Sequence, residues 1–259
     1  MILKSRYYKA EGIIIKSIKF GEGHKILTAY TKEFGRIEVT AFGSQKPKSK
    51  LANKTQLFNY VRFLLYHSHT KENEPFAVKE IEVLNYFDKI KEDYSRYIAA
   101  SCIVEPVVKL IGREQQDVGI FKLILKSFYV LDVIEERKII YLLIMYLVKL
   151  LSSMGYRFNL DLCAVCNSYL EGEIYADSFR GFPLCGRCKT ANSLKLSNGA
   201  AKFISWAQNE EVFKSSKVTM ELETLSNIKT ALQKVYEFIF NKSLDGWKYF
   251  DNLETTANR

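Results

Sequence analysis

Two closely spaced cysteine pairs constrain the fold of this chain more than any other feature. Two residues separate the cysteines within each pair, and eighteen residues separate the pairs. This is the spacing of a four-thiolate zinc site, because a short turn presents two sulfurs to one ion and a second turn completes a tetrahedron. Four thiolates leave no open coordination position, so the pattern predicts one structural Zn²⁺ per chain with these ligands: Cys163, Cys166, Cys185 and Cys188.

Two alternatives to zinc exist for these cysteines, namely two disulfides or four unrelated thiols. The spacing favours zinc over both. The chain has five cysteines, and with four of them in metal spacing the usage is typical of a reducing cytoplasm. The cysteines do not decide whether the zinc only holds a loop together or also presents a binding surface.

Positive charge is concentrated in the N-terminal third of the chain. The formal net charge of the 259 residues is +9. Residues 1–82 contain 15 Lys and Arg against 8 Asp and Glu, whereas residues 83–259 contain 23 against 21. A basic region of this kind favours a polyanionic partner, either nucleic acid or an anionic membrane surface.

Nothing in the sequence predicts membrane insertion or export. Met1–Arg6 is followed by polar and aromatic residues and not by the apolar run of a signal peptide. The longest apolar stretch, Ile139–Val148, is ten residues, which is shorter than the roughly eighteen that a membrane span needs. We therefore expect a cytoplasmic protein without a membrane partner, with this stretch forming a buried helix.

The first 84 residues have the pattern of short strands. β-branched and alternating runs separated by glycine turns predict five strands, at residues 12–18, 25–31, 36–42, 56–66 and 76–84. Five strands in fewer than ninety residues fit a small antiparallel barrel of OB type, and an SH3-like barrel is the alternative. We expect residues 1–84 to form a DNA-binding domain of this kind.

From about Asp88 the hydrophobic period changes to that of helices. The predicted helices cover residues 94–110 (with a kink or a new start at Pro106), 119–135, 137–154, 197–209 and 224–241. The cysteine segment, about residues 160–192, interrupts them. The sequence therefore predicts an α+β multidomain protein, with a helical domain at 85–259 that carries an inserted zinc element. Residues 241–259 are increasingly polar and are expected to fray.

Basic and aromatic residues of the predicted barrel are candidates for nucleic-acid contacts. The basic candidates are Lys16, Lys19, Lys25, Arg36, Lys46, Lys48, Lys50 and Lys54. Each one alone is more simply explained as a solvated side chain, and the Lys46–Lys50 loop is the best candidate because an anion relieves its self-repulsion. Base stacking is conceivable for Tyr30, Phe34, Phe42 and Tyr60, although a place in the barrel core explains most of them better.

Other residues have simpler interpretations. Cys102 lies on an apolar helix face and is expected to be a small buried hydrophobe, and Glu105 beside Pro106 is expected to be a helix-terminal charge. The sequence has no phosphate-binding glycine loop followed by Lys-Ser/Thr and no readable nucleophile–base pair. We therefore expect no enzymatic activity and no catalytic residues.

The chain resembles the RecO family of bacterial recombination-mediator and DNA-repair proteins. The resemblance covers nearly the whole chain and is carried by the segments 12–16, 20–27, 31–35, 41–44 and 46–50 and by Gly155-Tyr156-Arg157-Phe158 leading into Cys163. It implies an OB-fold, a helical domain and a zinc-binding element. Some family members lack the cysteines, so zinc is predicted from this sequence and not from the resemblance.

The resemblance also implies a function and partners. A RecO-like protein binds single- and double-stranded DNA, anneals complementary strands, and helps to load the RecA recombinase onto DNA coated by single-strand-binding protein. Its partners are RecR and the coating protein, and its place is the nucleoid. Two other classes remain open, namely a zinc-ribbon module of an RNA or transcription assembly, and a protein–protein scaffold with an incidentally basic barrel.

Overall fold

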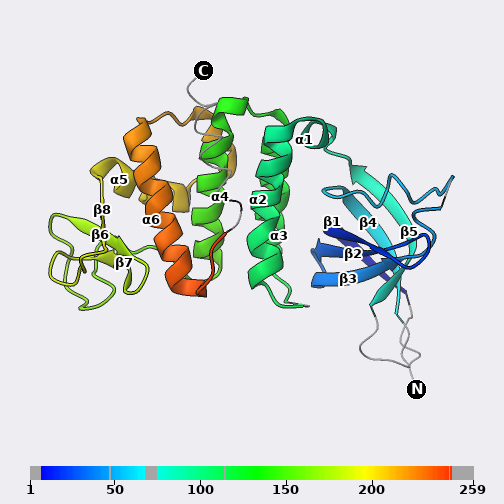
Figure 1. The fold of residues 1–259 in the computed structure, drawn as a ribbon, viewed down its shortest axis with the longest axis horizontal. Helices are drawn as coiled ribbons and strands as arrows, with labels where there is room; N and C mark the ends of the chain where they lie inside the picture. The colour runs from blue at the N-terminus through cyan, green and yellow to red at the C-terminus, as the bar shows by residue number, and fades with distance from the viewer. Residues whose placement is uncertain (1–6, 47, 68–74, 114, 245, 247–259) are drawn as a thin grey trace. The chain divides into compact units, whose positions relative to one another are not determined.

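The computed structural model describes residues 7–46, 48–67, 75–113, 115–244 and 246. The chain divides into two compact units (Figure 1). The first combines Met1–Glu92 with Val107–Asp132, and the second combines Asp93–Pro106 with Val133–Arg259. These units are defined by packing, and the domain boundary after residue 84 stays a prediction.

The N-terminal strands close into a barrel, as predicted. They are β1 (Tyr7–Phe20), β2 (His24–Thr31), β3 (Gly35–Ala41), β4 (Tyr60–Tyr66) and β5 (Phe76–Asn85). Their order around the barrel is β1-β2-β3-β5-β4, and every neighbouring pair is antiparallel except β3 and β5. This closed five-stranded arrangement is of the OB type.

Apolar side chains at alternate positions of the strands point inward and fill the barrel. In β2 and β3 the inward positions include Leu27, Ala29 and Val39, which are fully buried in one apolar cluster. A register shift in β1 between Ile14 and Lys16 changes which of its later residues face outward. The predicted strand at 56–66 begins only at Tyr60 in the structure, because the preceding residues form turns in which Phe58 has a φ of 70°.

The first unit also contains α1 (Asp88–Glu92), the end of α2 (Tyr94–Leu110) and most of α3 (Val118–Val133). The segment between α2 and α3 lies directly on the barrel. Gly35 in β3 has a φ of 64°, and a Cβ there would lie 2.2 Å from the carbonyl oxygen of Gln115. The Tyr30 hydroxyl also donates to the carbonyl oxygen of Asp117 at 3.5 Å. These contacts cover one end of the outer face of β2 and β3.

The second unit is built around α4 (Ile139–Ser153), which follows the short η1 (Glu136–Lys138). Nearly every residue of α4 is buried, as the apolar sequence predicts. Gly155, with a φ of 93°, ends it: its N–H donates to Ser152 O, and the N–H of Tyr156 donates to Leu151 O. Within the ranges described above, no helix is long and apolar enough to cross a membrane.

The cysteine segment forms a small sheet that packs on the last helix. β6 (Ile174–Asp177), β7 (Gly181–Leu184) and β8 (Leu194–Leu196) lie in the order β7-β6-β8. The chain then forms α5 (Asn198–Asn209), η2 (Val212–Lys217) and α6 (Leu222–Phe240), and α6 contacts all three strands (Figure 1). The Ser197 hydroxyl caps α5 by accepting from the N–H of Ala200, which places the start of the helix where the sequence predicts it.

Candidate metal centre and nucleic-acid interface

Two tight turns present the four cysteines. The first turn precedes β6, and the N–H of Asn167 closes it on the carbonyl oxygen of Cys163 at 2.9 Å. The second follows β7, and the N–H of Lys189 closes it on the carbonyl oxygen of Cys185 at 3.2 Å. Asn167 adopts a φ of 54°, a conformation that asparagine tolerates better than most residues. The two turns are therefore built alike, as two halves of one site.

The four sulfurs converge. All four Sγ atoms lie within 4.8 Å of one another, and those of Cys166 and Cys185 are 3.8 Å apart. A tetrahedral ion with metal–sulfur bonds of about 2.3 Å separates its ligand sulfurs by about 3.8 Å. The cysteines thus fit a tetrahedral metal ion. In the part of the chain that the structure describes, no other group of three or more His, Cys, Asp or Glu side chains is placed to hold one.

Electrostatics at the cysteines favour a bound cation. The Ser168 hydroxyl beside Cys166 lowers the pKa of that thiol to about 6. The Cys166 sulfur in turn raises the pKa of Cys188 to about 12. Thiolates at this separation repel one another, and a divalent cation between them removes that repulsion and keeps all four deprotonated. Cys163 is buried and Cys166 is exposed, so the site lies at the edge of the element.

A buried carboxylate braces the element beside the cysteines. Asp177, at the end of β6, is fully buried. Its oxygens accept the hydroxyls of Thr190 at 2.6 Å and Ser193 at 2.7 Å, and the N–H groups of Phe179 at 2.7 Å and Arg180 at 3.1 Å. Burial opposes ionisation, but these four donors outweigh it and lower the pKa of Asp177 to about 2. Asp177 therefore ties the β6–β7 turn to the chain after Cys188.

A buried glutamine fixes the chain that leads into the element. Gln208, on α5, accepts the N–H of Phe158 at 2.8 Å and donates to the carbonyl oxygen of Phe158 at 3.1 Å. The two bonds satisfy both backbone groups of one residue, much as a neighbouring strand would. Sequence reasoning missed Asp177 and Gln208, because the hydroxyls that Asp177 accepts lie 13 and 16 residues away in the chain and the partner of Gln208 lies 50 residues away.

Five of the eight basic candidates are exposed on the barrel. Lys16 and Lys19 lie on β1, and Lys46, Lys48 and Lys50 lie on the loop between β3 and β4. The loop is fastened to the turn between β1 and β2, because Gln45 donates from its backbone to Gly23 O at 3.0 Å and from its side chain to His24 O at 3.1 Å. The start of the lysine loop is therefore held beside the end of β1.

The other three basic candidates are engaged within the protein. Lys25 donates to the Thr55 hydroxyl at 3.2 Å, and burial lowers the pKa of its ammonium group. Arg36 donates to the carbonyl oxygen of Val108 at 2.7 Å, and Lys54 donates to that of Ile81 at 2.8 Å. These three offer less to an outside ligand than the five exposed lysines do.

Only one of the four aromatic candidates is exposed. Tyr30 is fully buried, Phe34 packs against the barrel core, and the Tyr60 hydroxyl donates to Glu11 at 2.9 Å. Phe42 is 55% exposed. The expectation that most of these rings belong to the core agrees with this arrangement.

A second exposed ring was not among the candidates. Phe20 is 50% exposed and pairs with His24 across β1 and β2. The His24 ring packs edge-on against Phe42, with centroids 5.3 Å apart. Phe20 at the end of β1, His24 at the start of β2 and Phe42 directly after β3 therefore form a row, which we call the aromatic row. One sequence pattern could have predicted this row. After the register shift, Lys16, Ile18 and Phe20 alternate along β1 and all face solvent.

Comparison with known proteins finds similarity over nearly the whole chain. The family described as "Recombination protein O N terminal" matches residues 4–87, and "Recombination protein O C terminal" matches residues 91–245. The DNA repair protein RecO of Acetivibrio thermocellus is 30% identical, over 92% of this chain and 98% of its own length. The DNA repair protein RecO of Halalkalibacterium halodurans is 26% identical, over 96% of both chains.

Proposed function

This chain belongs to the RecO family of DNA repair proteins, and on that premise we propose that it binds single- and double-stranded DNA and anneals complementary strands. We further propose that it helps to load RecA onto DNA coated by single-strand-binding protein, with RecR and the coating protein as partners. In this role the protein acts at the nucleoid without catalytic residues of its own.

One observation carries the proposal, namely the exposed lysines beside the aromatic row. Lysines bind phosphates at any sequence, and exposed rings stack on bases that are not paired. Lys19 directly precedes Phe20 on β1 and is exposed, and the start of the lysine loop is held beside the turn that follows β1. A phosphate near Phe20 would therefore meet Lys19 and the lysines of the loop. The end of the barrel thus combines the two groups that single-stranded DNA requires.

Annealing follows from the same charges. Two complementary strands repel each other through their phosphates, and lysines that hold one strand lower this repulsion for the second. Stacking on an aromatic side chain tolerates any base, so strands of any sequence can be held in this way. The protein would thus bring strands together without consuming a cofactor.

We also propose that the metal is Zn²⁺ and that its role is structural. Cys163, Cys166, Cys185 and Cys188 would hold it, and their sulfur-only donor set is typical of zinc. When bound, the ion supplies a cross-link between the two turns and no chemistry. Metal analysis of freshly purified, reduced protein should find about one zinc per chain. A value well below this would contradict the proposal.

Strand annealing across a salt series tests the function. Complementary oligonucleotides, naked or coated with single-strand-binding protein, are mixed with the protein, and duplex formation is followed by fluorescence. We expect annealing in both cases. Binding to single strands should weaken with salt with a log–log slope of about −3 to −4, if all five exposed lysines contact phosphates.

The outcomes separate the three functional classes. Salt-sensitive annealing of coated strands supports a recombination mediator. Binding without annealing would instead indicate a zinc-ribbon module of an RNA or transcription assembly. Absence of salt-dependent binding would indicate a scaffold and overturn the proposal.

A further inference from the structure

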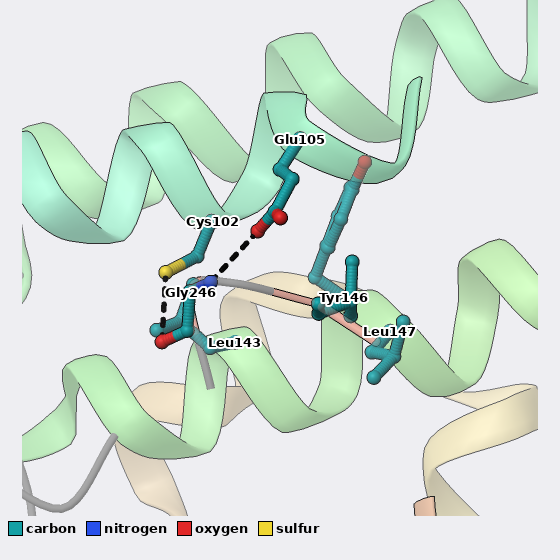
Figure 2. Close-up of a pocket in the computed structure, with 7 residues that line it drawn as sticks. Cys102, Glu105, Leu143, Tyr146, Leu147 and Gly246 are labelled. Carbon is teal, nitrogen blue, oxygen red and sulfur yellow. Dashed lines mark hydrogen bonds between the residues drawn. The ribbon is translucent and has the colours of Figure 1, made fainter. Parts of the chain in front are cut away.

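The chain beyond α6 does not simply fray. Residues 241–259 were expected to be a frayed terminus, yet Leu244 is only 8% exposed. Leu244 and Gly246 line a small cavity together with side chains of α2 and α4. Figure 2 shows Gly246 in this cavity beside Cys102 and Glu105. Asp245 and residues 247–259 lie outside the described part of the chain. The correction therefore concerns Leu244 and Gly246.

Two side chains of α2 bind the backbone of Gly246. Its N–H donates to Glu105 Oε2 at 2.9 Å, and its carbonyl oxygen accepts from the Cys102 thiol at 3.7 Å (Figure 2). Cys102 and Glu105 are three residues apart, so they project from the same face of the helix. Together they offer one acceptor and one donor, which is what the N–H and the carbonyl oxygen of a single residue require.

The site is selective for the residue it holds. A Cβ at Gly246 would lie 2.6 Å from Cys102 Sγ and 3.0 Å from Glu105 Oε2, so a side chain here must displace either the segment or the two side chains that bind it, and in both cases the two hydrogen bonds are disturbed. Two positions earlier, Leu244 lines the same cavity with Leu143 and Leu147 of α4, both nearly fully buried. The cavity that remains is about 10 Å³, room for roughly one water molecule. An aliphatic residue two positions before a glycine therefore fits both parts of the site.

From this geometry we propose that the face of α2 and α4 lined by Cys102, Glu105, Leu143 and Leu147 is a peptide-binding site. We call it the α2–α4 site. Its ligand is a segment with an aliphatic residue two positions before a glycine, and the chain's own Leu244 and Gly246 occupy it. The segment acts as a latch, and the same sequence supplied in trans binds when the latch is removed. This proposal does not depend on DNA binding.

Tethering explains why the latch stays closed. α6 ends at Phe240, so only a few residues connect it to Leu244. A ligand on so short a tether has an effective concentration of the order of millimolar. A free peptide at micromolar concentration therefore competes poorly with the latch in the wild-type chain. Weakening the latch should reveal the site without altering it.

The experiment uses full-length protein and a fluorescent peptide of residues 241–249. The latch variant is Gly246→Val. The control is Gly112→Val, because a Cβ at Gly112 would meet no atom closer than 3.6 Å. We expect the peptide to bind Gly246→Val at least about ten-fold more tightly than it binds the wild type or the control. A peptide that carries valine in place of its glycine should not bind.

Two further measurements keep the test decisive. Labelling of the Cys102 thiol, mapped by mass spectrometry, should accelerate in Gly246→Val and slow again when the peptide is added. Leu244→Ser, a second way to open the latch, should also bind the peptide, and adding Glu105→Ala to either latch variant should weaken this binding. If folded Gly246→Val and Leu244→Ser both fail to bind, or if the valine peptide binds equally well, the proposal is wrong.

Discussion

At the scale of single residues, side chains other than the four cysteines hold the chain around them in place. We call residues 161–196, which contain the cysteines and β6–β8, the metal element. The four cysteines can be read from the sequence, because their spacing alone determines what they can hold. Asp177, Gln208 and Glu105 cannot, because each acts on backbone or hydroxyl groups that only the fold brings near. The sequence predicts Glu105 as a helix-terminal charge, whereas its carboxylate accepts an N–H 141 residues away.

Replacing Asp177 should destabilise the element without touching a ligand. In Asp177→Ala, two hydroxyls and two backbone N–H groups lose their acceptor, and because these donors are only partly buried, water replaces the carboxylate for some of them, so that each costs less than the roughly 1–3 kcal/mol of a fully buried unpaired donor. We expect a loss of about 2–3 kcal/mol in unfolding free energy at pH 7, measured by urea denaturation. Asn192→Ala, at an exposed position in the same segment, is the control and should change stability by less than about 0.5 kcal/mol.

The contribution of Asp177 should also depend on pH. Its folded pKa of about 2 is below its unfolded value, so its stabilisation is complete above about pH 4 and disappears as the pH falls toward 2. The difference in unfolding free energy between wild type and Asp177→Asn, measured from pH 7 down to pH 3, should therefore narrow in this acidic window. A difference that stays constant over the whole range would show that the Asp177 charge contributes nothing.

At the scale of elements, the strands and helices were largely predictable, whereas the faces they present were not. Period-two and period-3.6 patterns located the barrel strands, α4 and α6, because burial enforces these periods. The bulge in β1 has no comparable pattern in the sequence. Because of this bulge, Phe20 faces outward. The turns at residues 56–59 were mistaken for strand because their apolar residues are buried without being extended.

Removing the aromatic row should weaken the binding of single strands more than that of duplexes. In duplex DNA the bases already stack on one another, so the rings have fewer faces to contact. We expect Phe20→Ala combined with Phe42→Ala to raise the Kd for single-stranded DNA about ten-fold or more, measured by fluorescence anisotropy. The Kd for a duplex should change much less. Equal losses for both would mean that the double variant disturbs the barrel itself. Tyr94→Ala, at an exposed ring outside the barrel, is the control.

The lysine loop should contribute to DNA binding through its charge and should not affect the fold of the barrel. Lys46, Lys48 and Lys50 are all exposed, so changing all three to alanine should leave the barrel folded. The triple variant should bind single strands more weakly, and the magnitude of its log–log salt slope should fall by about 2. The control changes Lys25, Arg36 and Lys54, one at a time, because their partners lie within the protein. If affinity and slope both survive in the triple variant, the loop is only a solvated surface.

At the scale of the whole molecule, charge and metal belong to different parts of the chain. The barrel has an excess of lysine, whereas residues 161–196 contain four basic and four acidic residues. Four thiolates around one Zn²⁺ would add a net charge of about −2 to this balanced segment. We therefore expect phosphates to be attracted to the barrel and not to the metal element. This distribution of charge favours a metal that only maintains the fold over a metal that also contacts DNA.

Separating the two parts by mutation tests this division. Cys166→Ser combined with Cys188→Ser should abolish metal binding and unfold the β6–β8 sheet, because structural zinc contributes directly to folding. Hydrogen exchange should therefore speed up in residues 161–196 and stay slow in β1–β5. Affinity for single-stranded DNA should change by less than about three-fold, with the same salt slope, because no lysine of the barrel is lost.

The loop variant should lose DNA affinity and keep its metal, which is the opposite of what we expect for the cysteine variant. With Lys46, Lys48 and Lys50 changed to alanine, the zinc content and the exchange rates of residues 161–196 should match the wild type while affinity and slope fall. If the cysteine variant lost affinity and also slope, phosphates would contact the metal element despite its charge. If it lost affinity at constant slope, the ion would act on DNA through the fold of the barrel, and rapid hydrogen exchange in β1–β5 would show this directly.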